Sequence, residues 1–458
     1  MAREALQIGC GAGFSNDRPE GGVGLIKTFI ANGRPAVLLY ETLAERTLAL
    51  AQLAKCQDPS KGYEPQLKSY LAPVLSSCLV HRIPIIGNFG AANPRSAAKQ
   101  IVSLAKELHL EKIRIGIIEG DDLLESHSPE EIMKCRNDAP PNLSAQRMVS
   151  ANVYLGAEPI VRALEGGVDV IVTGRVADPS LALGPLVHHF GWEWDDWDRL
   201  AAGTLAGHLL ECGAQLTGGY FADPGFKEVP DVAWVGFPIA EVNPDGHMFV
   251  TKATRTGGIV SRATVIEQIL YEIHDPSAYL TPDVVLDISN VTVHELGKDR
   301  VCIQGAKGKP RPDLFKAIIG FNDGWLGEGE ISYAGPNALA RARLAVSILK
   351  ERIKTNYPTC HLRGDIIGAC SVFNDDAGTA LDEIRGDVSD VRARVAVHSM
   401  DLEVAERVRK EVAALYCCGP AGGGGIRTAL TPRITTASAL IPRERVTPRV
   451  SFGEMKDA

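Results

Sequence analysis

The stretch ALQIGCGAGFSNDR, residues 5–18, introduces the pattern on which the first half of the chain is built. Its apolar start, residues 5–8, predicts a short strand. The alternate glycines that follow let a backbone turn sharply and expose N–H groups to an anion. We therefore expect this loop to form one wall of a ligand site. The loop residues expected to contact a small-molecule substrate are Gly11, Gly13, Ser15, Asn16 and Arg18.

Short apolar runs then alternate with helical patterns. The runs that predict strands are residues 5–8, 35–40, 84–87, 113–118, 149–155 and 169–172, and the helical patterns between them are residues 25–31, 42–55, 67–80, 96–108 and 159–165. Such alternation is typical of β–α–β units and a parallel sheet. The sequence therefore predicts an α/β fold whose N-terminal part is a mostly parallel sheet flanked by helices.

Polar residues follow the predicted strands at the point where each one ends. They are Glu41, Asn88, Asn93, Asp121, Asp122, Thr173, Arg175 and Asp178. Ligands of open parallel sheets bind at the carboxyl ends of the strands. We expect Asp121, Asp122 or Asp178 to act as a base or to bind Mg²⁺, and Arg175 to bind a carboxylate or phosphate. Because Asp178 precedes a proline, it is equally well explained as a helix N-cap.

The composition changes near residue 280. Beyond it, strand and helix patterns alternate without long parallel runs, which favours a smaller α+β sandwich. The sequence therefore predicts two domains, an α/β domain of residues 1–280 that carries the site and an α+β domain of residues 281–458. The second domain includes a glycine-rich run and a tail rich in proline and arginine.

The composition argues against several classes of protein. A formal net charge of −8 without a long basic block argues against a nucleic-acid partner. No apolar run approaches the length of about 20 residues that spans a membrane, and the N-terminus lacks a secretory signal pattern. Ten scattered cysteines are typical of a reducing cytosol. We expect a cytoplasmic protein that forms a homo-oligomer.

Common cofactor motifs are absent or incomplete. The spacing of the first glycines departs from the dinucleotide pattern because Phe14 stands where the third glycine belongs, which argues against NAD. A P-loop, a GxSxG elbow and an HExxH motif are absent from the sequence. His188 and His189 are adjacent and predict a structural role. His208 and Glu211 share a helix face. Their spacing fits an exposed polar pair, a catalytic pair or two metal ligands.

Six segments together are similar to one known family. They are IGCGAGFSNDR, LYETLAERTLALAQ, GNFGAANP, IIEGDD, VTGRVADPSLALGPL and CCGPAGGGGIR. They resemble the acyclic terpene utilisation protein family AtuA, formerly a domain-of-unknown-function family, over residues 7–452. The resemblance implies a place in the breakdown of acyclic terpenoid acids through CoA thioesters. It also implies a small companion subunit, and it supplies no catalytic residues.

Three functions follow from these observations. The first is a cytosolic lyase or hydro-lyase that uses acid–base chemistry on a small carboxylate or acyl-CoA. The second is a non-catalytic subunit that binds acyl-CoA or organises a pathway complex. The third is an NAD-dependent oxidoreductase, which the glycine spacing disfavours.

Overall fold

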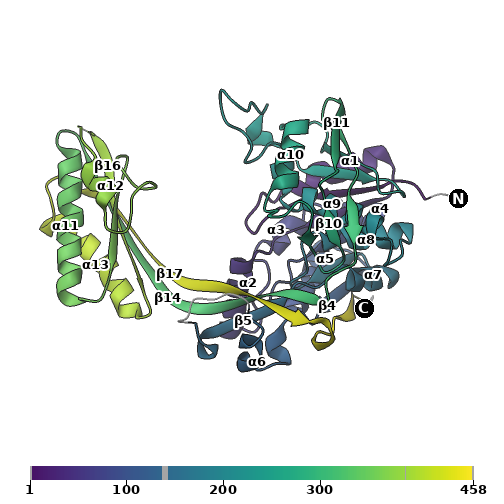
Figure 1. Cartoon of the computed structure of the whole chain (residues 1–458), viewed down its shortest axis with the longest axis horizontal. Helices are drawn as coiled ribbons and strands as arrows, with labels where there is room; N and C mark the ends of the chain where they lie inside the picture. Colours follow the sequence, from purple (N-terminus) through teal and green to yellow (C-terminus); the bar gives the residue numbers. More distant parts are fainter. Residues whose placement is uncertain (1–2, 137–142, 387, 456–458) are drawn as a thin grey trace. The chain divides into compact units, whose positions relative to one another are not determined.

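The computed structural model describes residues 3–136, 143–386 and 388–455. The chain forms two compact units (Figure 1). Unit 1 comprises Met1–Gly320 and Thr436–Ala458, and unit 2 comprises Phe321–Thr435. Both junctions lie within long strands, β14 (Leu314–Ala334) and β17 (Gly424–Pro442).

Unit 1 is built on a mixed sheet whose ten described strands lie in the order β11-β12-β8-β7-β1-β2-β3-β6-β4-β18. The five strands from β1 to β4 in this order pair in parallel. Every other pairing in the sheet is antiparallel. The architecture is thus mixed α/β, and parallel pairing is limited to the centre of the sheet.

The central strands are β1 (Leu6–Cys10), β2 (Ala36–Tyr40), β3 (Ile85–Gly87), β6 (Val170–Thr173) and β4 (Ile113–Glu119). The outer strands are β7 (Pro238–Val242), β8 (Met248–Lys252), β12 (Arg300–Gln304), β11 (Thr292–Gly297) and β18 (Arg449–Met455). Every residue of β1, β2, β3 and β6 is buried. Continuous apolar runs suit these strands because helices cover both of their faces.

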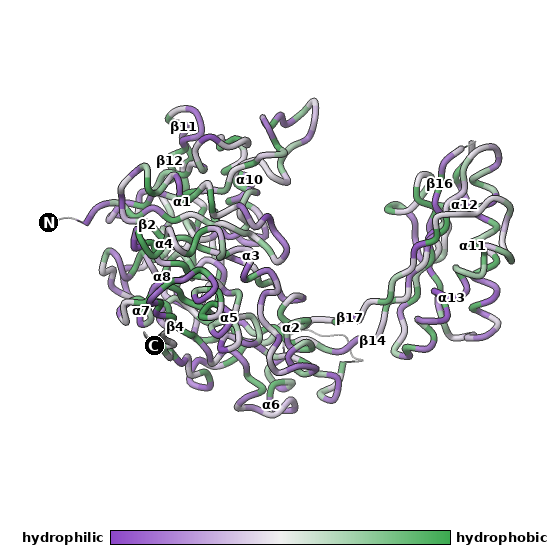
Figure 2. Tube along the Cα trace, turned by 180° about the vertical axis from the view of Figure 1, so that it is seen from behind, coloured by the Kyte–Doolittle hydropathy of each residue, from purple (hydrophilic) through white to green (hydrophobic). Residues whose placement is uncertain are grey.

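Helices on both faces bury the central strands. One face carries α1 (Gly21–Asn32), α3 (Leu67–Leu71), α4 (Leu75–His81) and α5 (Pro94–Glu107). The other face carries α7 (Glu158–Glu165), α8 (Ser180–Phe190) and α9 (Trp197–Glu211). The largest core cluster lies between the sheet and the first set. In Figure 2 the hydrophobic segments of this unit lie mainly in its interior.

Residues beyond 280 extend unit 1, so the division differs from the one expected near residue 280. A three-stranded sheet of β13 (Lys307–Lys309), β10 (Val285–Asp287) and β9 (Tyr279–Leu280) packs on α9. Strands β11 and β12 join the main sheet directly. These tertiary contacts outweigh the local change of composition and keep the segment in unit 1.

Other segments of unit 1 differ in detail from the predicted elements. The pattern of residues 67–80 forms two helices, α3 and α4, because Pro73 between them has no N–H to continue the helix. Strand β5 (Met148–Val153) pairs with β14 and not with the main sheet. The remaining helices are α2 (Glu45–Gln57), α6 (Pro129–Met133) and α10 (Arg262–Leu270), with short turns Leu123–Glu125, Ala145–Arg147, Gly213–Thr217, Val232–Trp234 and Arg443–Arg445.

Unit 2 is a sheet with two long helices on one face. Its strands lie in the order β15-β16-β14-β17, and β14 and β17 run side by side (Figure 1). Strand β15 is Leu362–Ile367, β16 is Asp390–Ser399, α11 is Ala338–Asn356, α12 is Thr379–Glu383 and α13 is Leu402–Cys418. Helices α11 and α13 contact each other and share one apolar core with β16.

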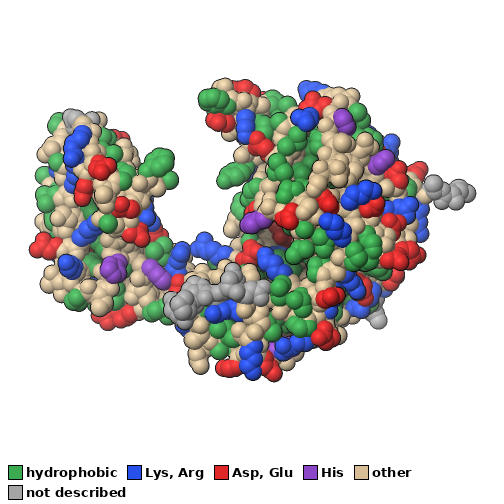
Figure 3. Space-filling model, viewed as in Figure 1, with side chains coloured by type: hydrophobic (Ala, Val, Ile, Leu, Met, Phe, Trp, Pro, Cys, Tyr) green, Lys and Arg blue, Asp and Glu red, His purple; other side chains and the backbone are tan. Residues whose placement is uncertain are grey.

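Charges of both signs are interspersed on the face shown in Figure 3, which carries no continuous basic stripe. Among the described helices, none is long and apolar enough to cross a membrane.

Candidate active site at the carboxyl ends of the central strands

The loop after β1 uses its own N–H groups internally. The Asp17 carboxylate accepts hydrogen bonds from the backbone N–H of Gly13 (2.9 Å) and of Arg18 (2.7 Å). An anion would therefore compete with a carboxylate that the loop already supplies. Gly13 has another reason to be glycine, since a Cβ there would overlap the backbone of Cys212 and Gly213. The Arg18 guanidinium donates to the Val235 carbonyl at 3.2 Å, away from the strand-end residues described below.

Glu41 and Asn88, at the ends of β2 and β3, meet directly. Asn88 Nδ2 donates to Glu41 Oε1 at 2.6 Å, and the Leu43 N–H donates to the same oxygen at 3.0 Å. Asn88 Oδ1 accepts the Thr42 N–H at 2.7 Å. Burial raises the pKa of Glu41 to about 7, against the opposing effects of Arg175 and Asn88. This carboxyl group therefore titrates near neutral pH.

Arg175, just after β6, is almost fully buried, with 1% of its surface exposed. Its guanidinium donates to the carbonyls of Val176 and Leu43 and forms an ion pair with Asp178. It also lies over the Tyr154 ring, 4.6 Å from the centroid. These donors are directed at the protein's own oxygens, so Arg175 holds three strand-end segments together.

Asp121, at the end of β4, is a second buried carboxyl group. It accepts hydrogen bonds from the Arg175 N–H and from Asn152 Nδ2, each at 2.8 Å. Burial raises its pKa to about 7. The neighbouring Asp122 accepts a hydrogen bond from the Gln52 side-chain amide at 2.8 Å. It also caps the short turn Leu123–Glu125. Burial raises the pKa of Asp122 as well.

The two remaining strand-end residues, Thr173 and Asn93, form hydrogen bonds with backbone groups of the protein. The Thr173 hydroxyl donates to the Gly174 carbonyl at 2.9 Å. Asn93 caps α5 and donates through its amide to the carbonyls of Pro59 and Lys61, at 2.9 and 2.7 Å. Asn93 thereby fixes the segment between α2 and α3, and residues 62–65 of this segment line a cavity.

A cavity of about 260 Å³, the strand-end pocket, lies beside this cluster. Its lining residues are Ser15, Asn16, Thr42, Leu43, Thr47, Leu50, Ala51, Ala54, Gly62, Tyr63, Glu64, Pro65 and Ala91. Thr42 and Leu43 belong both to its wall and to the hydrogen-bond network around Glu41. The structure thus places Ser15 and Asn16 in the wall of this pocket. Glu41 and Asn88 are joined to the wall through Leu43 and Thr42.

Glu64 is the ionisable carboxyl group in the wall of this pocket. Its side chain is hydrogen-bonded by the Ser15 hydroxyl and by the Gln66 N–H, the latter at 3.0 Å. Burial nevertheless raises its pKa. Gln66 in turn donates to Asn16 Oδ1 at 3.0 Å, so the loop after β1 and the segment of Glu64 are joined twice.

Several residues of this site carry no sequence signal of their own. Glu64 follows no predicted strand, and its place depends on the tertiary hydrogen bonds of Asn93. Tyr154 lies under the Arg175 guanidinium because β5 ends there. Their positions follow from long-range contacts, whereas Ser15 and Glu41 stand directly after apolar strands.

His208 and Glu211 form a buried pair on α9. His208 Nδ1 lies 3.0 Å from Glu211 Oε1, and 1% of the His208 side chain is exposed. Burial lowers the pKa of His208, and the Glu211 carboxylate more than offsets this, so the pKa is raised overall. Of the possibilities that the spacing leaves open, the exposed pair does not fit this burial.

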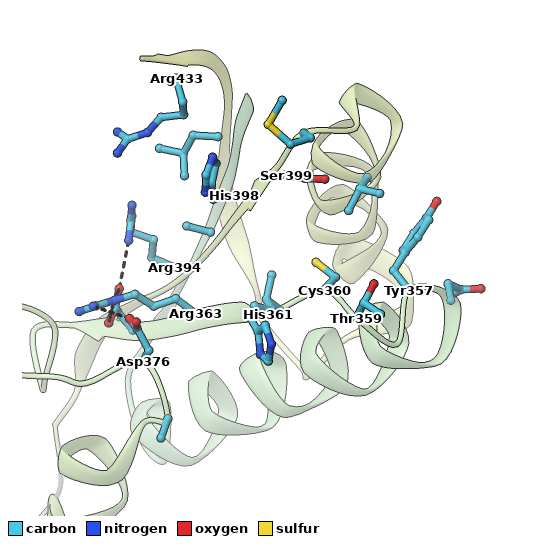
Figure 4. Close-up of a pocket in the computed structure, with 18 of the residues that line it drawn as sticks. Tyr357, Thr359, Cys360, His361, Arg363, Asp376, Arg394, His398, Ser399 and Arg433 are labelled. Atoms are coloured by element: carbon cyan, nitrogen blue, oxygen red, sulfur yellow. Dashed lines mark hydrogen bonds and ion pairs between the residues drawn. The ribbon is translucent and has the colours of Figure 1, made fainter. Parts of the chain in front are cut away.

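A second, larger cavity lies in unit 2, with a volume of about 1540 Å³. Figure 4 shows Arg363 and Arg394 near the labelled Asp376, and Arg363 Nη1 pairs with Asp376 Oδ1 at 3.0 Å. Asp365 joins the two arginines, since it pairs with Arg363 Nε at 3.2 Å and with Arg394 Nη1 at 3.0 Å. Arg433 and His361 line the same cavity. In the parts of the chain that the structure describes, no group of three or more His, Cys, Asp and Glu side chains is placed to hold a metal ion.

Comparison with known proteins identifies the family. The model of the family described as acyclic terpene utilisation family protein AtuA matches residues 6–452, nearly the whole chain. Neither the curated proteins nor the solved structures contain a significant match. The chain therefore belongs to the acyclic terpene utilisation family AtuA, and this membership implies a role in the utilisation of acyclic terpenes.

Proposed function

We propose that unit 1 is a cytosolic acid–base enzyme whose substrate binds in the strand-end pocket, with Glu64 as the group that transfers the proton. The observation that carries this proposal is a carboxyl group of raised pKa in the wall of a cavity whose lining is largely apolar. A carboxyl group whose pKa is raised above its ordinary value is a stronger base when ionised, and it can return the proton as an acid. The reaction class is that of a lyase or hydro-lyase.

The substrate is a small carboxylate or the acyl end of a thioester. A volume of about 260 Å³ lies just below the usual range of about 300–1,000 Å³ for small-molecule sites, so the pocket suits a compact acyl group. Glu64 takes the proton from the carbon beside the carbonyl, and the electron pair moves to the carbonyl oxygen. The Asn16 side-chain amide offers a hydrogen bond to that oxygen.

The surrounding cluster positions this group. The network of Glu41 and Asn88 fixes Thr42 and Leu43 in the pocket wall. Arg175 fixes the same wall through the Leu43 carbonyl. We propose that these are positioning residues, and that Asp121 extends the same network across β6.

The proposal is tested by a ligand screen followed by turnover measurements. Purified full chain is screened by thermal shift against CoA thioesters and dicarboxylates, and each stabilising compound is then assayed for conversion by mass spectrometry. Glu64→Gln should retain binding and lose turnover by about 100-fold or more. Glu193→Gln, an exposed residue, is the matched control and should keep full turnover. Equal turnover in Glu64→Gln would refute the assignment.

A second candidate function, a non-catalytic binding subunit, is favoured by the large cavity of unit 2. Its size and its arginine and histidine lining suit a large anionic ligand such as acyl-CoA. This function predicts stabilisation by CoA thioesters without conversion, and loss of that stabilisation in Arg433→Gln. A homo-oligomer and a small companion subunit remain predictions. Sedimentation of the purified chain tests the first, and co-purification tests the second.

A further inference from the structure

A third cavity lies at the opposite edge of the central sheet, where the parallel strands begin. It has a volume of about 480 Å³ and includes the residues at the amino ends of β1, β2, β3 and β6. Its apolar lining includes Leu6, Val37, Cys78, Leu79 and Ile83. We name it the amino-edge cavity. It shares no lining residue with the strand-end pocket, so a ligand here is separate from the proposed reaction.

The interior of the amino-edge cavity is apolar. Leu6, Val37 and Cys78 are each less than 5% exposed, and α4 and α7 contribute further aliphatic side chains. A volume of about 480 Å³ lies within the range of about 300–1,000 Å³ that is usual for small-molecule sites. Such a cavity suits an aliphatic chain, which gains free energy with every methylene that leaves water.

Four polar side chains also line the cavity, and one of them, Arg82, is an arginine. Arg82 ends α4 in the left-handed conformation and is exposed. No side-chain hydrogen bond or ion pair to the described residues is present at its guanidinium. Asp169, by contrast, already accepts the Arg114 N–H at 2.8 Å. The cation available to an anionic ligand is therefore that of Arg82.

His188 and His189 complete the polar lining at the end of α8. His189 Nε2 lies 2.9 Å from the Glu4 carbonyl, so its ring is held by the N-terminal segment. Burial lowers the pKa of His188, which favours the neutral ring at neutral pH and leaves it able to donate one hydrogen bond. This adjacent pair, which the sequence alone assigns to structure, thus stands at a cavity of ligand size.

We propose that the amino-edge cavity binds a medium-chain aliphatic carboxylate, with its chain among the apolar side chains and its carboxylate at Arg82. An arginine with free N–H donors recognises a carboxylate in two-pronged geometry. The neutral His188 ring supplies a further hydrogen bond. The combination of an apolar interior and the Arg82 cation distinguishes this ligand from a phosphate, which would need more donors. It also distinguishes it from an alkane or an alcohol, neither of which carries a charge that would pair with Arg82.

The experiment is a calorimetric titration of the full chain with hexanoate, octanoate and decanoate. Affinity should rise about fourfold for each methylene, until the chain fills the cavity. Octanol, which has the same chain without the charge, should bind about tenfold more weakly than octanoate. Equal binding of octanol and octanoate, or affinity independent of chain length, would overturn the proposal.

Two variants locate the binding. Arg82→Gln changes an exposed residue, leaves the fold intact, and should weaken octanoate about tenfold. Leu79→Trp fills the cavity and should weaken all three carboxylates. The matched control is Arg262→Gln, an exposed arginine at the start of α10, which should bind octanoate as the parent does. Undiminished octanoate binding by Arg82→Gln would place the ligand elsewhere and refute the assignment.

Discussion

Replacing Glu41 with Gln should change how the stability of the protein depends on pH. The glutamine carbonyl can still accept the hydrogen bond from Asn88 Nδ2, so the shape of the strand end is kept. What disappears is the ionisable group. Burial raises its pKa from 4.5 to about 7, and at about 1.4 kcal/mol per unit this corresponds to about 3 kcal/mol.

The sign of the effect follows from proton binding by the two states. Below the unfolded pKa of 4.5, Glu41 is protonated in both states and adds no pH dependence. As the pH rises towards 7, the unfolded chain releases the proton while the folded chain keeps it, so the free energy of unfolding falls. Above the folded pKa of about 7 the fall ends. Relative to Glu41→Gln, the parent should therefore lose about 3 kcal/mol across this window.

Urea unfolding of the parent and of Glu41→Gln, measured at half-unit steps of pH, checks this result. Glu193→Gln is the control and should follow the parent throughout, because its carboxyl group is exposed in the folded protein. The reasoning about Glu41 would be refuted if the difference between parent and variant were constant from acid to neutral pH. It would also be refuted if the parent gained stability over the variant as the pH rose.

Two further substitutions test the packing around the site. Gly13→Ala should lower the free energy of unfolding by about 2 kcal/mol, because the new Cβ meets the Cys212 backbone, which cannot move aside easily. Gly297→Ala, where nothing lies within 4 Å, should change it by less than about 0.5 kcal/mol in the same thermal unfolding assay. Arg175→Met should cost about 3 kcal/mol, because its buried oxygen partners lose their donors. The same substitution should raise the pKa of Glu41 further, because the Arg175 guanidinium charge lowers that pKa in the parent. A carboxyl-carbon NMR titration measures this shift, and an unchanged pKa of Glu41 would contradict the reasoning.

The central strands could be predicted because their sequence signal is local. Each is a continuous apolar run followed by a polar residue, as residues 35–40 and Glu41 show. The outer strands β7 and β8 lack such a signal, because the sequence pattern around them predicts irregular structure. Strand β7 takes its place by pairing with β1, which is distant in sequence, and β8 pairs with β7.

The glycines of β14 show why the second half was harder to interpret. In the sequence, Gly327 and Gly329 suggest turns between short extended pieces. In the structure both lie within one continuous strand. They are glycines because a Cβ at either position would overlap α13. Glycine is used there for close packing of a helix on a sheet. That reason becomes visible only once the helix is in place.

The candidate site was predictable to a similar extent. Glu41 and Asn88 follow strands and do meet, as their positions suggest. The hydrogen-bond partners of these side chains could not be predicted. In particular, the sequence does not show that the Arg175 guanidinium donates to carbonyl groups of the protein itself. Glu64 is brought to the pocket by a loop that Asn93 holds, and no periodic pattern marks such a loop.

The most direct test of the proposed function is the exchange of deuterium from D2O into a bound carboxylate or thioester at the carbon beside its carbonyl. Proton abstraction by Glu64 is common to the lyase and hydro-lyase reactions, so this measurement does not depend on which of them follows. NMR should detect exchange with the parent and with Glu193→Gln, and a rate at least about 100-fold lower with Glu64→Gln that still binds the ligand. Exchange at the parental rate in Glu64→Gln would contradict the account.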